Sequence, residues 1–446
     1  MAKNLVYDIH DRPKFGNMLL FAFQQVLAIL AATILVPAIV GHGMSQSAAL
    51  FGAGVGTLVY QLFTKFRSPV FLGSSFAFIG SMGAAFAGAA SISAGYAGLI
   101  VGAILAGLVY VVIALVIKFV GVAWINKLMP AVVIGPTVAL IGLSLSVNAV
   151  NDLYVGKVAG CSVYVAIICG LITLGAIFAF SVFGSKNIKL IPFVLGILVG
   201  YVAATIFTVI GLLTDNVELQ VINFAAFKDM SIFAVPDFAF VEAFKGVKAI
   251  DGAFLATVAV AYVPVAFVVF AEHIADHKNL SSIIEKDLLE DPGLDKTLLG
   301  DGVGSMAGAF FGGCPNTTYG ESVGCVAITK NASVITITTA AIMSIVISFF
   351  GPFVTFLSSI PNCVMGGVCV ALYGFIAVSG LKMIQKVDLN DSKNLFVVSA
   401  ILIPGIGGFS VSFGKVTLTT IACALILGIL TNTLLNKFQK KESSEN

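Results

Sequence analysis

The chain has 446 residues, of which 59% are hydrophobic and only 10% are charged, and its mean hydropathy is +1.05. Soluble domains usually carry about 25% charged residues, so the composition excludes a soluble protein and predicts an all-α membrane protein with many spans. The net charge of +2, without a basic patch, gives no reason to expect a nucleic-acid partner. The charged N-terminus leads directly into a full-length apolar segment, so we expect no cleaved signal peptide.

Hydropathy predicts fourteen membrane-spanning segments of about 20 residues each. In chain order we expect them at 17–40, 47–64, 70–90, 95–118, 128–148, 161–182, 189–213, 252–277, 297–313, 316–330, 333–357, 363–381, 394–411 and 416–437. Two longer polar stretches separate some of these spans. Residues 215–251 include a β-prone run at 219–224, and we expect residues 278–296 to hold a short surface helix that ends at 291–293.

The positions of lysine and arginine support this count. With fourteen spans and both termini in the cytoplasm, 19 of the 24 basic residues face the cytoplasm, as the positive-inside rule predicts. The five that face outward are Lys157, Lys228, Lys245, Lys248 and Lys415. A thirteen-span arrangement would reverse every loop after the missing span and lose this asymmetry.

The third and tenth spans share an unusual pattern. Each begins with a short extended, polar piece (SPVFLGSSF at 68–76, CPNTTYGE at 314–321) and continues as a half-helix. Interrupted spans at matching positions of two seven-span halves indicate an inverted repeat with a binding site where the half-helices meet. Their N-termini would offer free amides near the middle of the membrane. The alternative is that these Gly-rich spans merely pack closely, as we expect of residues 300–308.

Three acidic residues lie in or beside apolar sequence. Glu321 has apolar sequence on both sides, and a charged group inside a membrane is costly unless it has a function. Glu272 and Asp276 are four residues apart and share one face of a helix, although they could instead form its solvated end. Such carboxylates can exchange protons or accept hydrogen bonds from a solute. The scattered cysteines, and His273 and His277, show no metal-ligand spacing, so we expect no metal and no enzyme active site.

Several motifs together resemble the nucleobase–cation symporter-2 (nucleobase–ascorbate transporter) family, in particular its bacterial uracil-transporting branch. These motifs are FAEHI at 270–274, NTTYGE at 316–321, QQVLAILAATILVP at 24–37, LGSSFAF at 72–78 and KDLLEDPG at 286–293. The resemblance covers nearly the whole chain. It implies a permease of the bacterial cytoplasmic membrane that imports uracil with protons and works as a homodimer.

The resemblance also implies a division into two domains built from two inverted seven-span repeats. The core domain would comprise residues 1–127 (spans 1–4) and 252–357 (spans 8–11). The gate domain would comprise residues 128–213 (spans 5–7) and 358–437 (spans 12–14). Residues 214–251 would form an external loop and residues 438–446 a cytoplasmic tail.

For the site, the resemblance implies that Glu272 and Glu321 bind the substrate. Backbone groups of Tyr319 and Gly320 would help, and the pocket would be lined by Phe76, Ala32 and Tyr373. Proton coupling would involve Glu272, Asp276 and Glu321, with no cofactor besides the coupling proton.

Departures from the pattern of the family's uracil members leave the substrate open. Gln24-Gln25 stands where those members often have Gln-His. Asp276 occupies a place where uracil members often carry His, and an acid there is typical of the purine and xanthine branch. Glu321, at the first position of the broader family signature, favours uracil. A purine or xanthine symporter is therefore the alternative within the family. Two alternatives belong to other functional classes: an anion exchanger or channel with the same inverted repeats, and a membrane-embedded enzyme. The buried acids, together with the lack of an arginine inside the predicted spans, argue against an anion as the substrate.

Overall fold

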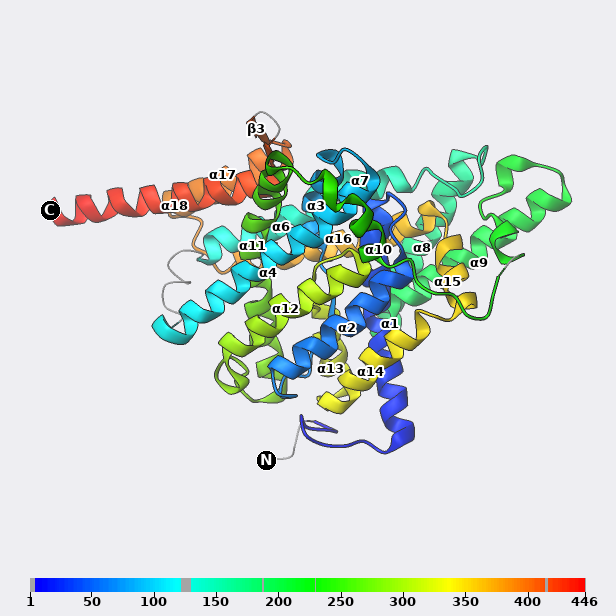
Figure 1. Cartoon of the computed structure of the whole chain (residues 1–446), viewed down its shortest axis with the longest axis horizontal. Helices are drawn as coiled ribbons and strands as arrows, with labels where there is room; N and C mark the ends of the chain where they lie inside the picture. Colours follow the sequence, from blue (N-terminus) through cyan, green and yellow to red (C-terminus); the bar gives the residue numbers. More distant parts are fainter. Residues whose placement is uncertain (1–4, 122–129, 187, 229, 414–415, 446) are drawn as a thin grey trace.

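The structure is a computed structural model that describes residues 5–121, 130–186, 188–228, 230–413 and 416–445 (Figure 1). Lys127 and the predicted beginning of the fifth span and gate domain at residue 128 lie outside these ranges.

Helices make up nearly all of the fold. The helices are α1 (Phe15–Val40), α2 (Gln46–Phe63), α3 (Ile79–Ala87), α4 (Ile92–Val120), α6 (Ala131–Ser144), α7 (Ser146–Asp152), α8 (Val163–Phe183), α9 (Pro192–Leu213), α10 (Ala239–Gly246), α11 (Gly252–Ile284), α12 (Leu294–Gly312), α13 (Gly320–Thr329), α14 (Val334–Ile347), α15 (Gly351–Ser359), α16 (Asn362–Ile384), α17 (Ser392–Ile406) and α18 (Thr420–Glu445). Short single turns occur at η1 (Phe76–Phe78), η2 (Ile188–Leu190), η3 (Val217–Leu219), η4 (Phe224–Phe227), η5 (Val247–Ala249) and η6 (Leu289–Gly293). The strands are β1 (Leu72–Ser74), β2 (Asn316–Thr318), β3 (Val411–Phe413) and β4 (Val416–Leu418).

Within the described residues, 8 helices are long and apolar enough to cross a membrane, so the chain is a multi-pass helical membrane protein. They include α1, α4, α8, α9, α11 and α16, together with residues 131–152 and 420–438. The other predicted spans coincide with shorter or more polar helices, among them α2, α12, α14 and α17. The total of fourteen crossings therefore stays a prediction.

Two stretches between the predicted spans differ from what their local sequence suggests. Residues 278–284 belong to the long helix α11 rather than to a separate surface helix, because Leu280 and Ile284 are buried against neighbouring elements. The β-prone run at 219–224 forms no strand within the described residues. Instead, the N–H groups of Val221 and Ile222 both donate to the Thr208 side chain at 3.0 Å, which holds the run against α9.

The contacts between helices divide them into two groups that meet along a shared boundary. In the first group α12 packs between α2 and α4, and α1, α11 and α14 pack around them. In the second group α16 packs on α6 and α8, α9 packs on α8, and α17 packs on α6 and α18. The contacts between the groups involve mainly α1 and α11 on one side and α6, α9, α16, β4 and α18 on the other.

The predicted interruptions of the third and tenth spans are present, and they pair with each other. Strands β1 and β2 lie antiparallel, with Leu72 opposite Thr318 and Ser74 opposite Asn316. Because the strands are antiparallel, the helical segments that follow them (η1–α3 and α13) begin at opposite ends of the pair and run apart. Two segments far apart in the sequence thus meet in the interior of the first helix group.

Close helix packing brings this strand pair into place. A Cβ on Gly304 would lie 2.7 Å from the carbonyl oxygen of Gly56, so α12 and α2 approach backbone to backbone. The Asn316 side chain uses this space and donates a hydrogen bond to the Gly52 carbonyl at 3.1 Å. The expected close packing of the Gly-rich helix α12 is therefore confirmed, and it occurs together with the interrupted spans rather than instead of them.

Candidate functional site

A cavity of about 500 Å³ lies at the boundary between the two helix groups. The first group contributes its polar wall, which includes Glu272, Asp276, Thr317, Tyr319, Gly320 and Glu321. The second group contributes a mostly apolar wall, which includes Ile134, Phe193, Leu372, Phe375 and Ser379. The cavity therefore has one face that can form hydrogen bonds and one face that can cover an apolar surface.

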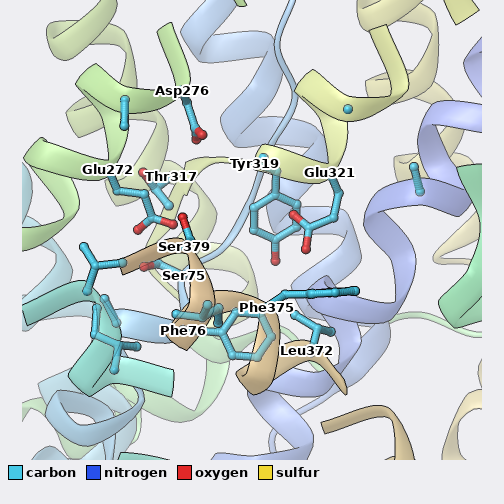
Figure 2. A pocket seen from close by; sticks show the side chains of 18 of the residues that line it. Ser75, Phe76, Glu272, Asp276, Thr317, Tyr319, Glu321, Leu372, Phe375 and Ser379 are labelled. Atoms are coloured by element: carbon cyan, nitrogen blue, oxygen red, sulfur yellow. The ribbon is translucent and has the colours of Figure 1, made fainter. Parts of the chain in front are cut away.

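The three acids reach the cavity from two elements. Glu272 and Asp276 lie one turn apart on α11, which continues to Ile284, so neither acid is at a solvated helix end. Glu321 lies in the first turn of α13. In Figure 2 the carboxylates of Glu272 and Glu321 lie on either side of the Tyr319 ring and point toward the level of Phe76, whereas Asp276 lies farther away.

The beginning of α13 offers backbone donors at the same place. No side chain caps this helix, and its first turn begins at Gly320, which lines the cavity. Tyr319 anchors the turn, since its hydroxyl donates to the Ser74 carbonyl at 2.7 Å and its N–H donates to the Phe71 carbonyl at 3.2 Å. A Cβ on Gly73 would lie 2.3 Å from the Tyr319 ring, so only glycine allows this close approach.

A buried hydrogen-bond network behind the cavity joins three elements. Asp301 of α12 accepts a hydrogen bond from the Thr317 hydroxyl at 3.1 Å and lies 2.8 Å from Nδ1 of His273. The other ring nitrogen of His273 lies 3.1 Å from the Thr297 hydroxyl. Asp276 is held separately, by the Thr318 hydroxyl at 2.9 Å. The network fixes β2 against α11 and α12 and so determines where the cavity side chains lie.

This network was not predicted from the sequence, in which His273 showed only that it lacks metal-ligand spacing and Asp301 was only part of a Gly-rich packing segment. One signal was available: His273 follows Glu272 directly and therefore faces away from the cavity, where a buried polar side chain needs a partner.

The structure brings six of the expected site residues together in the cavity lining: Phe76, Glu272, Asp276, Tyr319, Gly320 and Glu321. It does not place Ala32 or Tyr373 in that lining. Ala28, one helical turn before Ala32, takes its position. Tyr373 lies behind Phe76 and meets its ring edge-on, with ring centroids 6.0 Å apart at 77°. Phe375, Ser379 and Lys189, which the sequence analysis did not single out, also line the cavity.

This geometry suits a small, flat, polar solute. Glu272 and Glu321 can accept hydrogen bonds from N–H groups, and the first-turn amides of α13 can donate to carbonyl oxygens. Phe76 and Phe375 offer apolar ring surfaces. Within the described residues no group of His, Cys, Asp and Glu side chains has an arrangement that could hold a metal ion.

Sequence comparisons place the chain among transporters. A sequence model described as "Permease family" matches residues 16–414. The uracil permease of Bacillus caldolyticus is 39% identical over 433 residues, which cover 96% of this chain and 94% of the relative. The uracil permease of Bacillus subtilis is 36% identical, covering 99% of this chain and 98% of the relative. The uracil permease of Escherichia coli is 32% identical, covering 94% and 92%.

Solved structures of low sequence identity share the fold. The transmembrane domain of the cyanobacterial bicarbonate transporter BicA matches with a TM-score of 0.61 at 15% identity, covering 96% of this chain and all of that domain. The murine anion transporter Slc26a9 in its inward-facing state matches with a TM-score of 0.66 at 11% identity, covering 96% of this chain and 69% of that protein. At these identities the likeness concerns the fold alone.

Proposed function

The chain belongs to the nucleobase–cation symporter-2 family, a transporter family rather than an enzyme family, and from this premise we propose that it imports uracil with protons across the bacterial cytoplasmic membrane. The single observation that carries the proposal is the cavity in which Glu272 and Glu321 flank the uncapped beginning of α13.

Uracil matches this cavity group by group. The base is a flat ring with two N–H donors and two carbonyl acceptors. The carboxylates of Glu272 and Glu321 take the N–H groups, the first-turn amides of α13 take a carbonyl oxygen, and the ring of Phe76 covers a face of the base. Hydrogen bonds to charged acceptors are roughly twice as strong as neutral ones, so the acids supply most of the polar recognition.

Proton coupling follows from the charge in the same space. Glu272, Asp276 and Glu321 all line one cavity, and within its lining only Lys189 has a positive charge. Several ionised carboxylates at short range repel one another in a medium of low dielectric constant. A proton bound to one of the three acids relieves this repulsion and leaves the other carboxylates ionised to accept the N–H groups of the base. Binding of the proton and of the base then assist each other, and an inward proton gradient drives uptake.

One alternative within the family rests on Asp276. This acid could take part in binding a purine or xanthine, but its carboxylate already accepts a hydrogen bond from Thr318 and lies apart from the level of Phe76 (Figure 2). An anion exchanger with the same fold is disfavoured, because three acids line the cavity and would repel an anion.

The larger architecture completes the proposal. We assign the helix group that contains α1, α2, α4 and α11–α14 to the core domain and the group that contains α6–α9 and α16–α18 to the gate domain. Fourteen spans in two inverted repeats place both termini in the cytoplasm, and two copies form a homodimer.

Uptake of radiolabelled uracil into proteoliposomes tests this function. We expect an inward proton gradient to drive accumulation, a protonophore to abolish it, and unlabelled uracil to compete better than xanthine, hypoxanthine or thymine. Preferential block by xanthine would overturn the uracil assignment. Uptake that follows a sodium gradient instead would overturn the proton assignment.

A further inference from the structure

A second cavity of about 430 Å³ lies on the other side of Phe76. Its lining shares just two residues with that of the carboxylate cavity, Phe76 and Ala77. Phe76, the larger of these two side chains, therefore lies between the two spaces. The second cavity contains none of the acids, and nothing in the proposed binding of uracil uses it.

The linings of the two cavities extend toward opposite ends of the helices. The carboxylate cavity is lined by residues in the last turns of α13 and α16, Ile328 and Met383, which the proposed topology places near the cytoplasm. The second cavity is lined by Val40 at the end of α1 and by Thr420 at the beginning of α18, which the same topology places near the outside.

The second cavity has the lining that a neutral polar solute requires. Its polar side chains come from both helix groups and carry no charge: Ser81, Ser144, Asn148, Ser410, Thr419 and Thr420. Gly80 and Gly83 of α3 leave its surface open, since a Cβ at either position would meet nothing within 4 Å. A movement of one helix group against the other would change the width of this space directly.

Phe76 itself bridges the two groups. It lies in η1, at the joint between β1 and α3, and its ring meets Tyr373 of α16 edge-on. Only 9% of the residue is exposed even though two cavities border it, so its side chain is closely packed between them.

We propose that the ring of Phe76, supported by Tyr373, separates the carboxylate cavity, which is the inner one, from the second cavity, which is the outer one. The outer cavity is then the entrance through which the base approaches the carboxylates. The role of the outer cavity as an entrance rests on the proposed function, whereas the role of Phe76 as a barrier does not. Phe76 then has two roles: its ring is a contact surface for the bound base, and it is the barrier between the base and the outer cavity.

Thiol labelling from outside tests the barrier without any substrate. Ser379 is exposed in the inner cavity and Gly83 is exposed in the outer one, so Ser379→Cys and Gly83→Cys report on the two spaces. A charged, membrane-impermeant methanethiosulfonate reagent is added to intact cells in the cold. Labelling at each position is measured by peptide mass spectrometry, so that the native cysteines do not interfere.

We expect the reagent to label Gly83→Cys whether or not Phe76 is replaced. Labelling of Ser379→Cys should rise at least tenfold when Phe76→Ala is added and should stay low with Phe76→Met, which keeps most of the bulk. Size-exclusion profiles identify variants that fold, and Phe76→Val replaces Phe76→Ala if that variant does not. Equal labelling of Ser379→Cys in all folded backgrounds, with Gly83→Cys still reactive, would overturn the partition. Because labelling needs no uracil, failure of uracil uptake would leave this result unaffected.

Discussion

Replacing Glu321 tests how much of the binding energy one carboxylate supplies. In the proposed complex this side chain accepts an N–H hydrogen bond from the base. Hydrogen bonds to charged groups contribute about 1.5–3 kcal/mol and neutral ones about 1 kcal/mol. Glu321→Gln keeps a neutral acceptor and should weaken binding about fivefold, whereas Glu321→Ala removes the acceptor and should weaken it by about 10- to 100-fold.

Equilibrium binding of radiolabelled uracil to the detergent-purified protein measures both effects. Glu242→Gln is the matched control, because Glu242 lies on α10 outside the cavity lining, where its carboxylate accepts hydrogen bonds from Lys245 and Ser93. This variant should bind like the wild type. If both Glu321 variants elute as folded protein and bind uracil within twofold of the wild type, Glu321 does not contact the base and the reasoning is refuted.

Two further substitutions test the framework around the cavity by thermal melting. Asp301→Ala should lower the melting temperature by several degrees, because it leaves His273 and the Thr317 hydroxyl without an acceptor, at about 1–3 kcal/mol each. Asp301→Asn keeps an acceptor oxygen and should lower the melting temperature less. Equal melting temperatures of the wild type and both Asp301 variants would contradict the network. Gly304→Ala should destabilise by about 1–3 kcal/mol, since its Cβ meets the Gly56 carbonyl, whereas Gly374→Ala meets nothing within 4 Å and should not. Equal shifts for the two glycine variants would show that the close approach of α12 and α2 is unimportant.

Local sequence was sufficient to predict the interrupted spans. A polar run with a proline inside apolar sequence, as at 314–321, cannot continue a membrane helix, so an extended piece and a half-helix were predictable. The acids were predictable for a related reason, because a carboxylate within apolar sequence needs a cavity. Their positions in one lining follow from helix periodicity on α11 and from the first turn of α13.

Long-range contacts were not predictable in the same way. The register of β1 with β2 depends on side chains such as Tyr319, which fits over Gly73, and no local pattern encodes that fit. The apolar wall from α16 depends on how the two helix groups meet. This is why the cavity is lined by Phe375 and Ser379, whereas Tyr373, on a neighbouring face of the same helix, lies behind Phe76.

The central claim is that uracil binds between Glu272 and Glu321 against Phe76. A crystal structure with 5-bromouracil, measured at the bromine absorption edge, tests it most directly, since the anomalous signal of bromine locates the base without ambiguity. We predict one strong anomalous peak in the carboxylate cavity, with the ring of the base at Phe76 and its N–H groups directed at the two glutamates. A peak elsewhere, or an empty cavity in crystals of protein that binds uracil in solution, would contradict the claim.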